Sequence, residues 1–175
     1  GVAAAEAEGG QTALAAALFD ESVVLFDMSE YAERDSVAQL VGARGSQDAG
    51  QLTEGVLRSP ASVVLLNDID KAHPEVLKVV LRILVDGGII DGHGRAVDFT
   101  GAVVVASCGL GDGSDPAKTT VILRRYFKPE FLSSLDEIVI FRALGEEDLG
   151  RIVDIEVASL GDRLSGRGLA IALTA

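Results

Sequence analysis

The segment from Ser62 to His73, with the sequence SVVLLNDIDKAH, limits what this chain can fold into. Four consecutive apolar residues, Val63 to Leu66, are typical of a strand that is buried on both faces of a parallel sheet. The polar pair Asn67-Asp68 follows directly, at the carboxyl end of that strand, where open α/β sheets bind their ligands. The segment therefore predicts an α/β fold with a polar site after its central strand.

The composition supports this fold class and argues against several kinds of partner. The apolar fraction is 48%, aromatic residues make up 5% and Trp is absent, so the core is expected to be aliphatic, as in an α/β protein. The net charge of −12 argues against nucleic acid and anionic membrane surfaces as partners, because phosphate binding needs clustered Lys and Arg. No apolar run approaches the roughly 20 residues that span a bilayer, and no secretory signal is present.

The single cysteine, Cys108, excludes an internal disulfide and argues against a cysteine-based metal site. We therefore expect a reducing, cytoplasmic compartment. Cys108 is interpreted as a small, partly buried core residue and not as a nucleophile.

Helical and strand patterns alternate along the chain. Apolar runs predict buried strands at residues 23–26, 63–66 and 103–105 and a further strand at 138–140. Helical spacing predicts helices at 13–18, 51–58, 75–85 and 121–127. We expect a hairpin over 89–99 with its turn at 91–94, loops at 42–50 and 109–115, and a short segment at 30–33 capped by Ser29. After a domain boundary at Leu144-Gly145, one long amphipathic helix (146–165) and a short strand (169–173) are expected.

Six sequence blocks follow one another in a recognisable order: DMSEY (27–31), QLTE (51–54), SVVLLNDIDKAHP (62–74), DGHGRAVDF (91–99), FKPEFL (127–132) and LDEIVIF (135–141). In order and approximate spacing, they resemble the second AAA+ module of the Clp-type ATP-dependent chaperones and unfoldases (ClpA, ClpB and ClpC). The resemblance covers nearly the whole chain.

This resemblance implies a doubly wound αβα P-loop domain with a mainly parallel sheet at residues 1–144, followed by the start of a small helical lid domain at 145–175. It also implies a hexameric ring, ATP or ADP with Mg²⁺ at the subunit interfaces, and protein substrates that are threaded through the pore. The nucleotide-sensing arginine of the family's lid would fall beyond Ala175.

The P-loop of the family corresponds to residues 5–12, AEAEGGQT, and its cofactor-binding candidates are Gly9, Gly10, Gln11 and Thr12. Thr12 is also the expected magnesium ligand. Ala5 replaces the first glycine, and Gln11 replaces the lysine that holds the phosphates. Glu6 and Glu8 add negative charge where a polyanion would bind. Two unit charges about 4 Å apart interact by about 4 kcal/mol at an effective dielectric constant near 20, so these changes predict weak nucleotide binding.

The Walker B pair of the family is Asp-Glu, and this chain has Asn67-Asp68. Asn67 supplies no negative charge to a magnesium ion and is at most a weak ligand. Asp68 keeps a carboxylate, and it is the candidate residual catalytic acid, but its side chain is one methylene shorter than that of Glu. A displacement of about 1 Å can lower the rate of a positioned reaction roughly a hundredfold. Alternatively, Asp68, Asp70 and Lys71 form a polar helix start with local ion pairing.

Two further catalytic positions of the family are altered. Gly109 stands in the place of the sensor asparagine, and Ser134 stands in the place of the arginine finger, which supplies a factor of roughly 10³ to 10⁵ in related chemistry. A nearby cation could substitute for the finger or be a solvated surface charge; the candidates are Arg124, Arg125 and Lys128.

The pore-loop segment and the two histidines are not expected to take part in catalysis or threading. The family's pore loop holds an aromatic residue between glycines, whereas residues 42–50 contain none, which argues against threading by an aromatic side chain. His93 is interpreted as an exposed turn residue, and His73 as a structural residue at a helix start and not as a catalytic base.

The departures at Gln11, Asn67, Asp68, Gly109 and Ser134 affect separate parts of one mechanism. Together they predict a Clp-like AAA+ module that has lost ATP hydrolysis and acts in ring assembly, regulation of an active subunit, or other protein–protein contacts. The alternatives are a working ATPase with atypical motifs, in which Asp68 is the catalytic acid, and a stand-alone adaptor. Both ring hypotheses predict a hexamer, and the adaptor hypothesis predicts a monomer or dimer.

Overall fold

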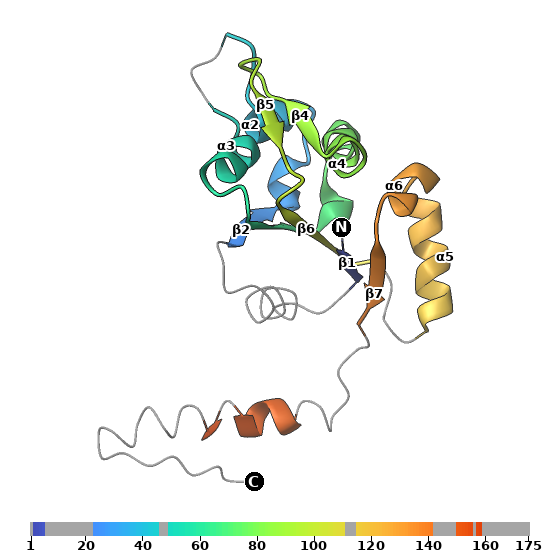
Figure 1. Cartoon of the computed structure of the whole chain (residues 1–175). Coiled ribbons are helices and arrows are strands. Elements are labelled where there is room, and N and C mark those ends of the chain that lie inside the picture. Colours follow the sequence, from blue (N-terminus) through green and yellow to red (C-terminus); the bar gives the residue numbers. More distant parts are fainter. Residues whose placement is uncertain are drawn as a thin grey trace, which may run out of the picture. The chain divides into compact units, whose positions relative to one another are not determined.

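The computed structural model describes residues 23–45, 49–110, 115–141, 150–155 and 157–158, and the backbone of residues 2–5 (Figure 1). The chain divides into two compact units, residues 1–142 and 143–175. In the second unit, the described residues 150–155 and 157–158 are helical. The predicted boundary at Leu144-Gly145, the helix at 13–18 and the strand at 169–173 lie outside the described residues.

The first unit is built on a five-stranded sheet with the order β2-β3-β6-β1-β7, in which all the pairs are parallel. The strands are β1 (Val2–Ala5), β2 (Val23–Asp27), β3 (Val63–Asn67), β6 (Val103–Cys108) and β7 (Glu137–Ile140). From β1 the chain passes to the far edge at β2, returns through β3 and β6, and then crosses to the other side of β1. This is a doubly wound sheet, as predicted.

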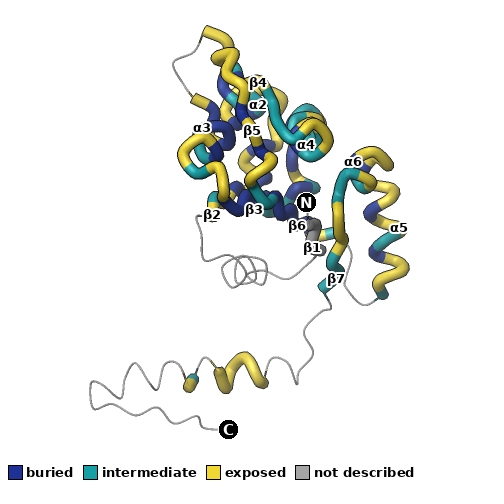
Figure 2. Tube along the Cα trace, in the orientation of Figure 1, coloured by how far each residue is buried: buried dark blue, intermediate teal, exposed yellow. Residues whose placement is uncertain are grey.

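The run Val63–Leu66 forms the core of β3 and is buried on both faces, as predicted. Val64 and Leu66 belong to the main hydrophobic cluster, whereas Val63 and Leu65 pack with Val105 in a second cluster. Figure 2 shows buried residues along β3 and β6. Since both faces of the central strands are covered, apolar residues run along them without alternation.

Strand β2 was also predicted to be buried, and this prediction is wrong for one of its faces. Val23 and Leu25 expose 37% and 54% of their surface, while Phe26 is buried in the main cluster. Among the strands that the structure describes, β2 lies at the edge of the sheet and pairs only with β3, and its side chains alternate between the core and the opposite face.

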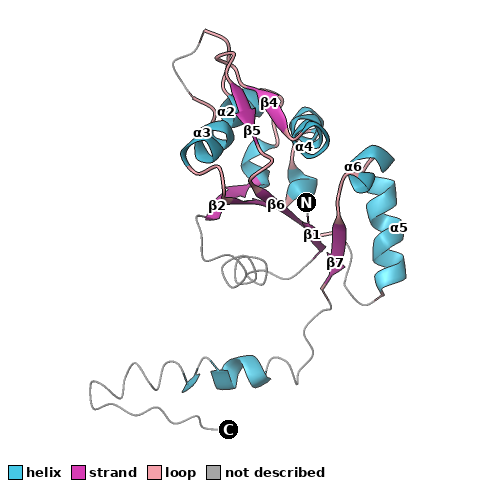
Figure 3. Ribbon diagram, in the orientation of Figure 1, coloured by secondary structure: helices cyan, strands magenta, loops and turns pink. Residues whose placement is uncertain are grey.

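Two helices and a hairpin form a layer beside the sheet (Figure 3). Helix α2 spans Ser36–Val41 and α3 spans Gln51–Arg58, as predicted for α3. The hairpin consists of β4 (Gly88–Ile90) and β5 (Ala96–Asp98), which pair antiparallel around the predicted turn. The sequence analysis did not predict α2, whose six residues are too few for a clear helical period.

Helix α4 spans Pro74–Asp86 and carries a cap at each end. The His73 Nδ1 atom accepts a hydrogen bond from the Glu75 N–H at 3.2 Å, which gives His73 the structural role expected for it. Gly87 ends the helix in the left-handed conformation (φ 70°), as glycine commonly does. On the inner face of α4, Val76, Val80 and Ile83 are buried.

Helices α5 (Pro116–Tyr126) and α6 (Pro129–Ser133) follow β6. α5 was predicted to start at residue 121, but it starts five residues earlier. The Asp115 carboxylate caps it by accepting hydrogen bonds from the Ala117 and Lys118 N–H groups, and Pro116 occupies the first turn. An Asp-Pro pair is a helix-start signal, and it was overlooked because the apolar spacing becomes clear only from Val121.

The predicted cap at Ser29 is wrong. A 3₁₀ helix (η1) spans Met28–Tyr31, and its cap is Asp27, whose Oδ1 accepts hydrogen bonds from the Ser29 N–H at 3.0 Å and the Ser29 hydroxyl at 2.6 Å.

In the part of the chain that the structure describes, no helix is long and apolar enough to cross a membrane.

Candidate functional site

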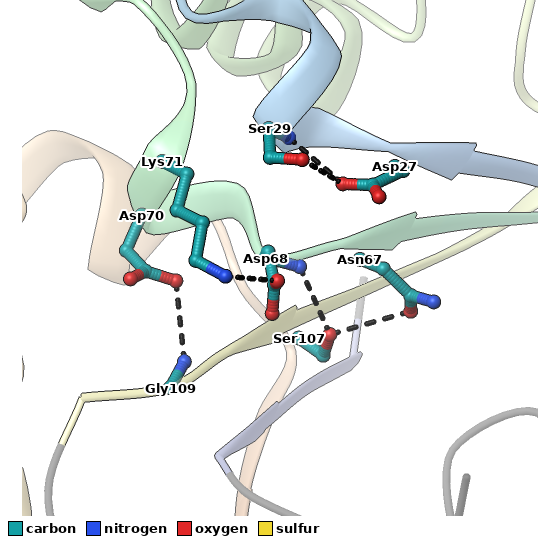
Figure 4. Close-up of polar contacts among 8 residues, drawn as sticks. All are labelled: Asp27, Ser29, Asn67, Asp68, Asp70, Lys71, Ser107 and Gly109. Carbon is teal, nitrogen blue, oxygen red and sulfur yellow. Dashed lines mark hydrogen bonds and ion pairs between the residues drawn. The ribbon is translucent and has the colours of Figure 1, made fainter. Parts of the chain in front are cut away.

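The carboxyl ends of β2, β3 and β6 lie at one edge of the parallel sheet and bring polar residues together there (Figure 4). Asp27 at the end of β2 is paired in register with Asn67 at the end of β3. Ser107 comes from the end of β6 and contacts Asn67. β1 ends at Ala5, where the sequence places the first P-loop position, and the P-loop candidates Gly9 to Thr12 lie outside the described residues.

Ser107 connects the two residues of the altered Walker B pair. Its hydroxyl donates a hydrogen bond to the Asn67 Oδ1 at 3.3 Å and accepts one from the Asp68 N–H at 3.2 Å. Ser107 is buried. The Asn67 amide is therefore held by a neutral neighbour and offers no net charge. Sequence reasoning did not identify this role of Ser107, since nothing in the spacing indicates it.

Asp68 has the left-handed conformation, with φ 55° and ψ 46°, and no other non-glycine residue in the described part of the chain has a positive φ. Asp tolerates this region better than most residues, but the conformation is uncommon and clusters at functional sites. It turns the chain from β3 into the 3₁₀ helix η2 (Ile69–Lys71). The backbone at this position is therefore fixed in a specific geometry.

The carboxylate of Asp68 is ion-paired with Lys71 (Figure 4), with 2.5 Å between the Asp68 Oδ2 and the Lys71 Nζ. The side chains of Lys71 and Asp68 are 55% and 39% exposed. The hydrogen bond to Asp68, and then its charge, raise the pKa of Lys71. The local ion pairing considered for this segment is therefore present, and the one acid of the Walker B pair has an internal cation as its partner.

Asp70 fixes the position of Gly109. Its Oδ1 accepts a hydrogen bond from the Gly109 N–H at 3.2 Å, and its carbonyl oxygen accepts one from the Tyr126 hydroxyl. Gly109 thus contributes a backbone N–H and no side chain at the sensor position. None of the described residues comes within 4 Å of a Cβ atom added there, so this part of the structure leaves room for a side chain.

Asp27 also lies at this edge, but its carboxylate is used by the cap of η1. The hydrogen bond from the Ser29 hydroxyl, and then that from the Ser29 N–H, lower the pKa of Asp27. Within the described residues, no group of three or more His, Cys, Asp or Glu side chains could hold a metal ion.

The family implies a bound Mg²⁺ and nucleotide, and the described residues fit the metal poorly. Mg²⁺ is bound through one or two carboxylates together with phosphate oxygens. Here Asn67 offers an amide oxygen that already accepts a hydrogen bond, and Asp68 offers a carboxylate that is paired with Lys71. The other expected ligand, Thr12, lies outside the described residues.

The finger position is occupied by a serine that is engaged locally. Ser134 is at the end of α6, and its hydroxyl donates a hydrogen bond to the Phe131 carbonyl oxygen at 2.7 Å. The neighbouring cations Arg124, Arg125 and Lys128 are exposed, and none forms an ion pair with another residue that the structure describes.

Cys108 is buried, in agreement with its interpretation as a core residue.

The hairpin turn contains a buried carboxylate that sequence reasoning missed. Asp91 accepts hydrogen bonds from the N–H groups of His93 and Arg95, at 2.9 and 2.8 Å, and from the Arg95 Nε at 2.7 Å. Arg95 also bonds Glu54 of α3 at 2.5 Å, so the hairpin is tied to that helix. The Asp-Gly-x-Gly-Arg pattern is the signal that could have indicated this turn. His93 is exposed in the turn, as expected.

Comparisons with known proteins agree with this architecture. The AAA domain (Cdc48 subfamily) family matches residues 2–138. The chain belongs to this family. Among curated relatives, the chaperone protein ClpB of Mycobacterium bovis is 46% identical over 165 residues, which cover 91% of this chain and 20% of the relative. ClpB of Streptomyces albus G is 45% identical over 177 residues, which cover 93% of this chain and 21% of the relative.

A solved structure of Hsp104 in a closed state, with ATPγS and FITC casein, has a TM-score of 0.80 to this chain at 29% identity, covering 93% of this chain and 32% of that one. The predicted resemblance to a Clp-type AAA+ module, and the predicted αβα fold, are therefore confirmed. The chain spans about a fifth of the length of the curated relatives that it matches.

Proposed function

We propose that this chain is a Clp-type AAA+ module with lost or weak ATP hydrolysis, which serves assembly or regulation through contacts with other proteins. The observation that carries the proposal is the pair Asn67-Asp68, in which an amide replaces one acid and the other forms an ion pair with Lys71. The same proposal assigns residues 1–144 to the large nucleotide-binding-type domain and residues 145–175 to the start of the small lid domain.

Hydrolysis in P-loop nucleotidases depends on positioning and on electrostatic stabilisation. A residue that orients the attacking water must keep its carboxylate free to accept a hydrogen bond from that water. The Asp68 carboxylate is shorter than the expected Glu and directed to Lys71, which supports a loss of this role. Gly109 offers no side chain for the sensor role, and Ser134 carries no charge for the finger role.

The second candidate is a module that still hydrolyses ATP with atypical motifs. One observation favours it: Asp68 keeps a carboxylate, 39% exposed, at the end of β3. An exposed ion pair contributes about 0–1 kcal/mol, so a nucleotide-bound magnesium could compete with Lys71 for this group. The two candidates differ in nucleotide affinity and in turnover.

We expect calorimetric titration of the purified chain with ATP and Mg²⁺ to give no saturable heat at micromolar nucleotide, and phosphate release to match that of an unfolded control. Asp68→Asn should leave this background unchanged. Magnesium-dependent turnover that Asp68→Asn abolishes would refute the proposal and establish the second candidate. Lys118→Gln, which alters an exposed lysine on α5, is the matched control for nonspecific effects.

The proposed partners are proteins: subunits of a ring, of the same or another kind, or a client protein. Light scattering of the purified chain distinguishes the forms of the proposal. A hexamer supports a place in a ring, whereas a monomer or dimer supports the adaptor hypothesis. The proposed location is cytoplasmic, in keeping with the single buried Cys108.

A further inference from the structure

A cavity of about 350 Å³ lies between α4 and the segment that joins α5 to α6, away from the altered Walker B pair. Figure 1 shows α4 beside α5 and α6 in the first unit. The residues that line the cavity are Ala72, Pro74, Leu77, Lys78, Leu81, Tyr126, Phe127, Lys128 and Phe131. Its size falls within the range of sites that hold organic ligands or inserted side chains.

One wall is a stripe of α4. Pro74, Leu77 and Leu81 are spaced three and four residues apart and therefore share one face of the helix. This face is turned away from the inner face of α4, where Val76, Val80 and Ile83 are buried. Leu77 and Leu81 pack against the edge of the main hydrophobic cluster but are only half-buried, so part of their apolar surface is left facing the cavity.

The other wall is aromatic. Phe127 and Phe131 stack with their ring centroids 5.1 Å apart, and Tyr126 meets Phe127 edge to face at 5.0 Å. Phe127 and Phe131 are buried, so their positions are fixed by packing, whereas Tyr126 is 50% exposed. The Tyr126 hydroxyl is held by the carbonyl oxygen of Asp70, which fixes this ring as well. Rigid aromatic walls lose little conformational entropy when a partner binds.

The rim of this cavity is basic, although the chain has a net charge of −12. Lys78 stands on the α4 wall and Lys128 on the opposite wall. Lys78 is paired with Glu75 at 2.6 Å, and Lys128 has no ion pair among the residues that the structure describes. Further exposed cations lie on α4 and α5, outside the lining of the cavity: Arg82, Arg124 and Arg125. The acidic residues on α4, α5 and α6 are Glu75, Asp86 and Glu130, and none of them lines the cavity.

We propose that this basic, apolar cavity is a docking site for an acidic amphipathic segment of a partner protein. Leu or Phe side chains of the partner fill the space between the α4 stripe and the aromatic wall. Flanking carboxylates pair with Lys78 on one wall and Lys128 on the other. A segment with several carboxylates fits better than a fatty acid, because basic residues line both walls and continue beyond the cavity.

The test uses the full chain and a fluorescein-labelled amphipathic peptide composed of Leu, Phe and Glu. Fluorescence anisotropy should show saturable binding that weakens as salt is raised, because exposed charge pairs are screened. Lys78→Glu and Lys128→Glu together should weaken binding about tenfold or more. Arg44→Glu, an exposed charge reversal in the loop after α2, should leave binding unchanged. A peptide with Ser in place of Leu and Phe should not bind.

Three results would overturn the proposal. The first is no binding at any accessible peptide concentration, or binding that the double charge reversal leaves unchanged. The second is a dimer in light scattering that Lys128→Glu dissociates, which would assign the surface to a second copy of this chain. The third is tighter binding of decanoate than of the peptide, which would assign the cavity to a fatty acid. Circular dichroism of each variant shows whether a loss of binding reflects unfolding.

Discussion

The Asp91 carboxylate has no exposed surface and accepts three hydrogen bonds, two from backbone N–H groups and one from the Arg95 guanidinium. Replacing it with Asn keeps the shape but removes the charge and places an NH₂ group against a donor. We expect Asp91→Asn to lower the free energy of unfolding by about 2 kcal/mol at neutral pH, as for hydrogen bonds to charged groups. Urea unfolding measures the change, and a difference below about 0.5 kcal/mol would contradict it.

A separate prediction concerns how the difference in free energy of unfolding between wild type and Asp91→Asn depends on pH. Burial opposes ionisation of Asp91, but hydrogen bonds from Arg95 and His93 overcome it, and the pKa of Asp91 is lowered. The stabilisation is therefore complete above the pKa of an unfolded Asp, about 3.9, and is lost as the pH falls through the lower folded pKa. The stability difference between wild type and Asp91→Asn should be constant from pH 7 to about pH 5 and shrink below about pH 4. Asp86→Asn, at an exposed position at the end of α4, serves as the control.

At the residue scale, the sequence located the altered Walker B pair because a four-residue apolar run ends immediately before it. It also indicated ion pairing around Lys71 from the alternation of charges. It did not indicate that Ser107 connects Asn67 to Asp68, or that Asp70 holds the Gly109 N–H. Those contacts join strands about 40 residues apart in the chain, and only the register of the sheet brings them together.

At the scale of single elements, the end of α4 depends on Gly87. Its φ is 70°, and an added Cβ would lie 3.0 Å from the Thr100 Cγ2. We expect Gly87→Ala to destabilise the chain by about 1–2 kcal/mol, since a left-handed conformation is unfavourable for a residue with a Cβ and the contact with Thr100 adds to it. Chemical denaturation followed by circular dichroism measures the effect.

Gly94→Ala is the matched control, because Gly94 has a similar φ of 82° and no described residue lies within 4 Å of an added Cβ. It should lose stability through strain alone, and therefore less than Gly87→Ala. Equal losses for the two variants would show that the Thr100 contact contributes nothing.

The elements that sequence reasoning predicted well are those with a strong period or strong end signals. Strand β3, helix α3 and helix α4 are of this kind, with proline or glycine near the ends of two of them. The short helices α2 and α6 were missed because five or six residues do not complete two helical turns. The exposed face of β2 was missed because an apolar run does not show whether a strand lies at an edge.

At the scale of the whole molecule, weak nucleotide binding at the altered site predicts that nucleotide stabilises the folded chain only slightly. A ligand that binds only the folded state stabilises it by about 2.7 kcal/mol at one hundred times its Kd, but by only about 0.4 kcal/mol at its Kd. For a chain of 175 residues, these values correspond to shifts in Tm of roughly 5–10 °C and about 1 °C. A thermal shift therefore separates tight from weak binding without requiring turnover.

We expect millimolar ATP with Mg²⁺ to raise the Tm of this chain by less than about 2 °C. A variant that restores the family pattern carries Gln11→Lys, Asn67→Asp, Asp68→Glu and Gly109→Asn. It should respond more strongly, because it regains a phosphate-binding cation and a carboxylate at position 67, and its carboxylate at position 68 is one methylene longer. The described part of the structure leaves room for the new side chain, since none of its residues lies within 4 Å of a Cβ added at Gly109. If wild type already shifts by more than about 5 °C, and only with magnesium, the proposed loss of nucleotide binding is wrong. If neither protein responds but the restored variant is folded, the loss lies in Ala5, Glu6 and Glu8 of the P-loop segment, and reverting these is the next substitution to make.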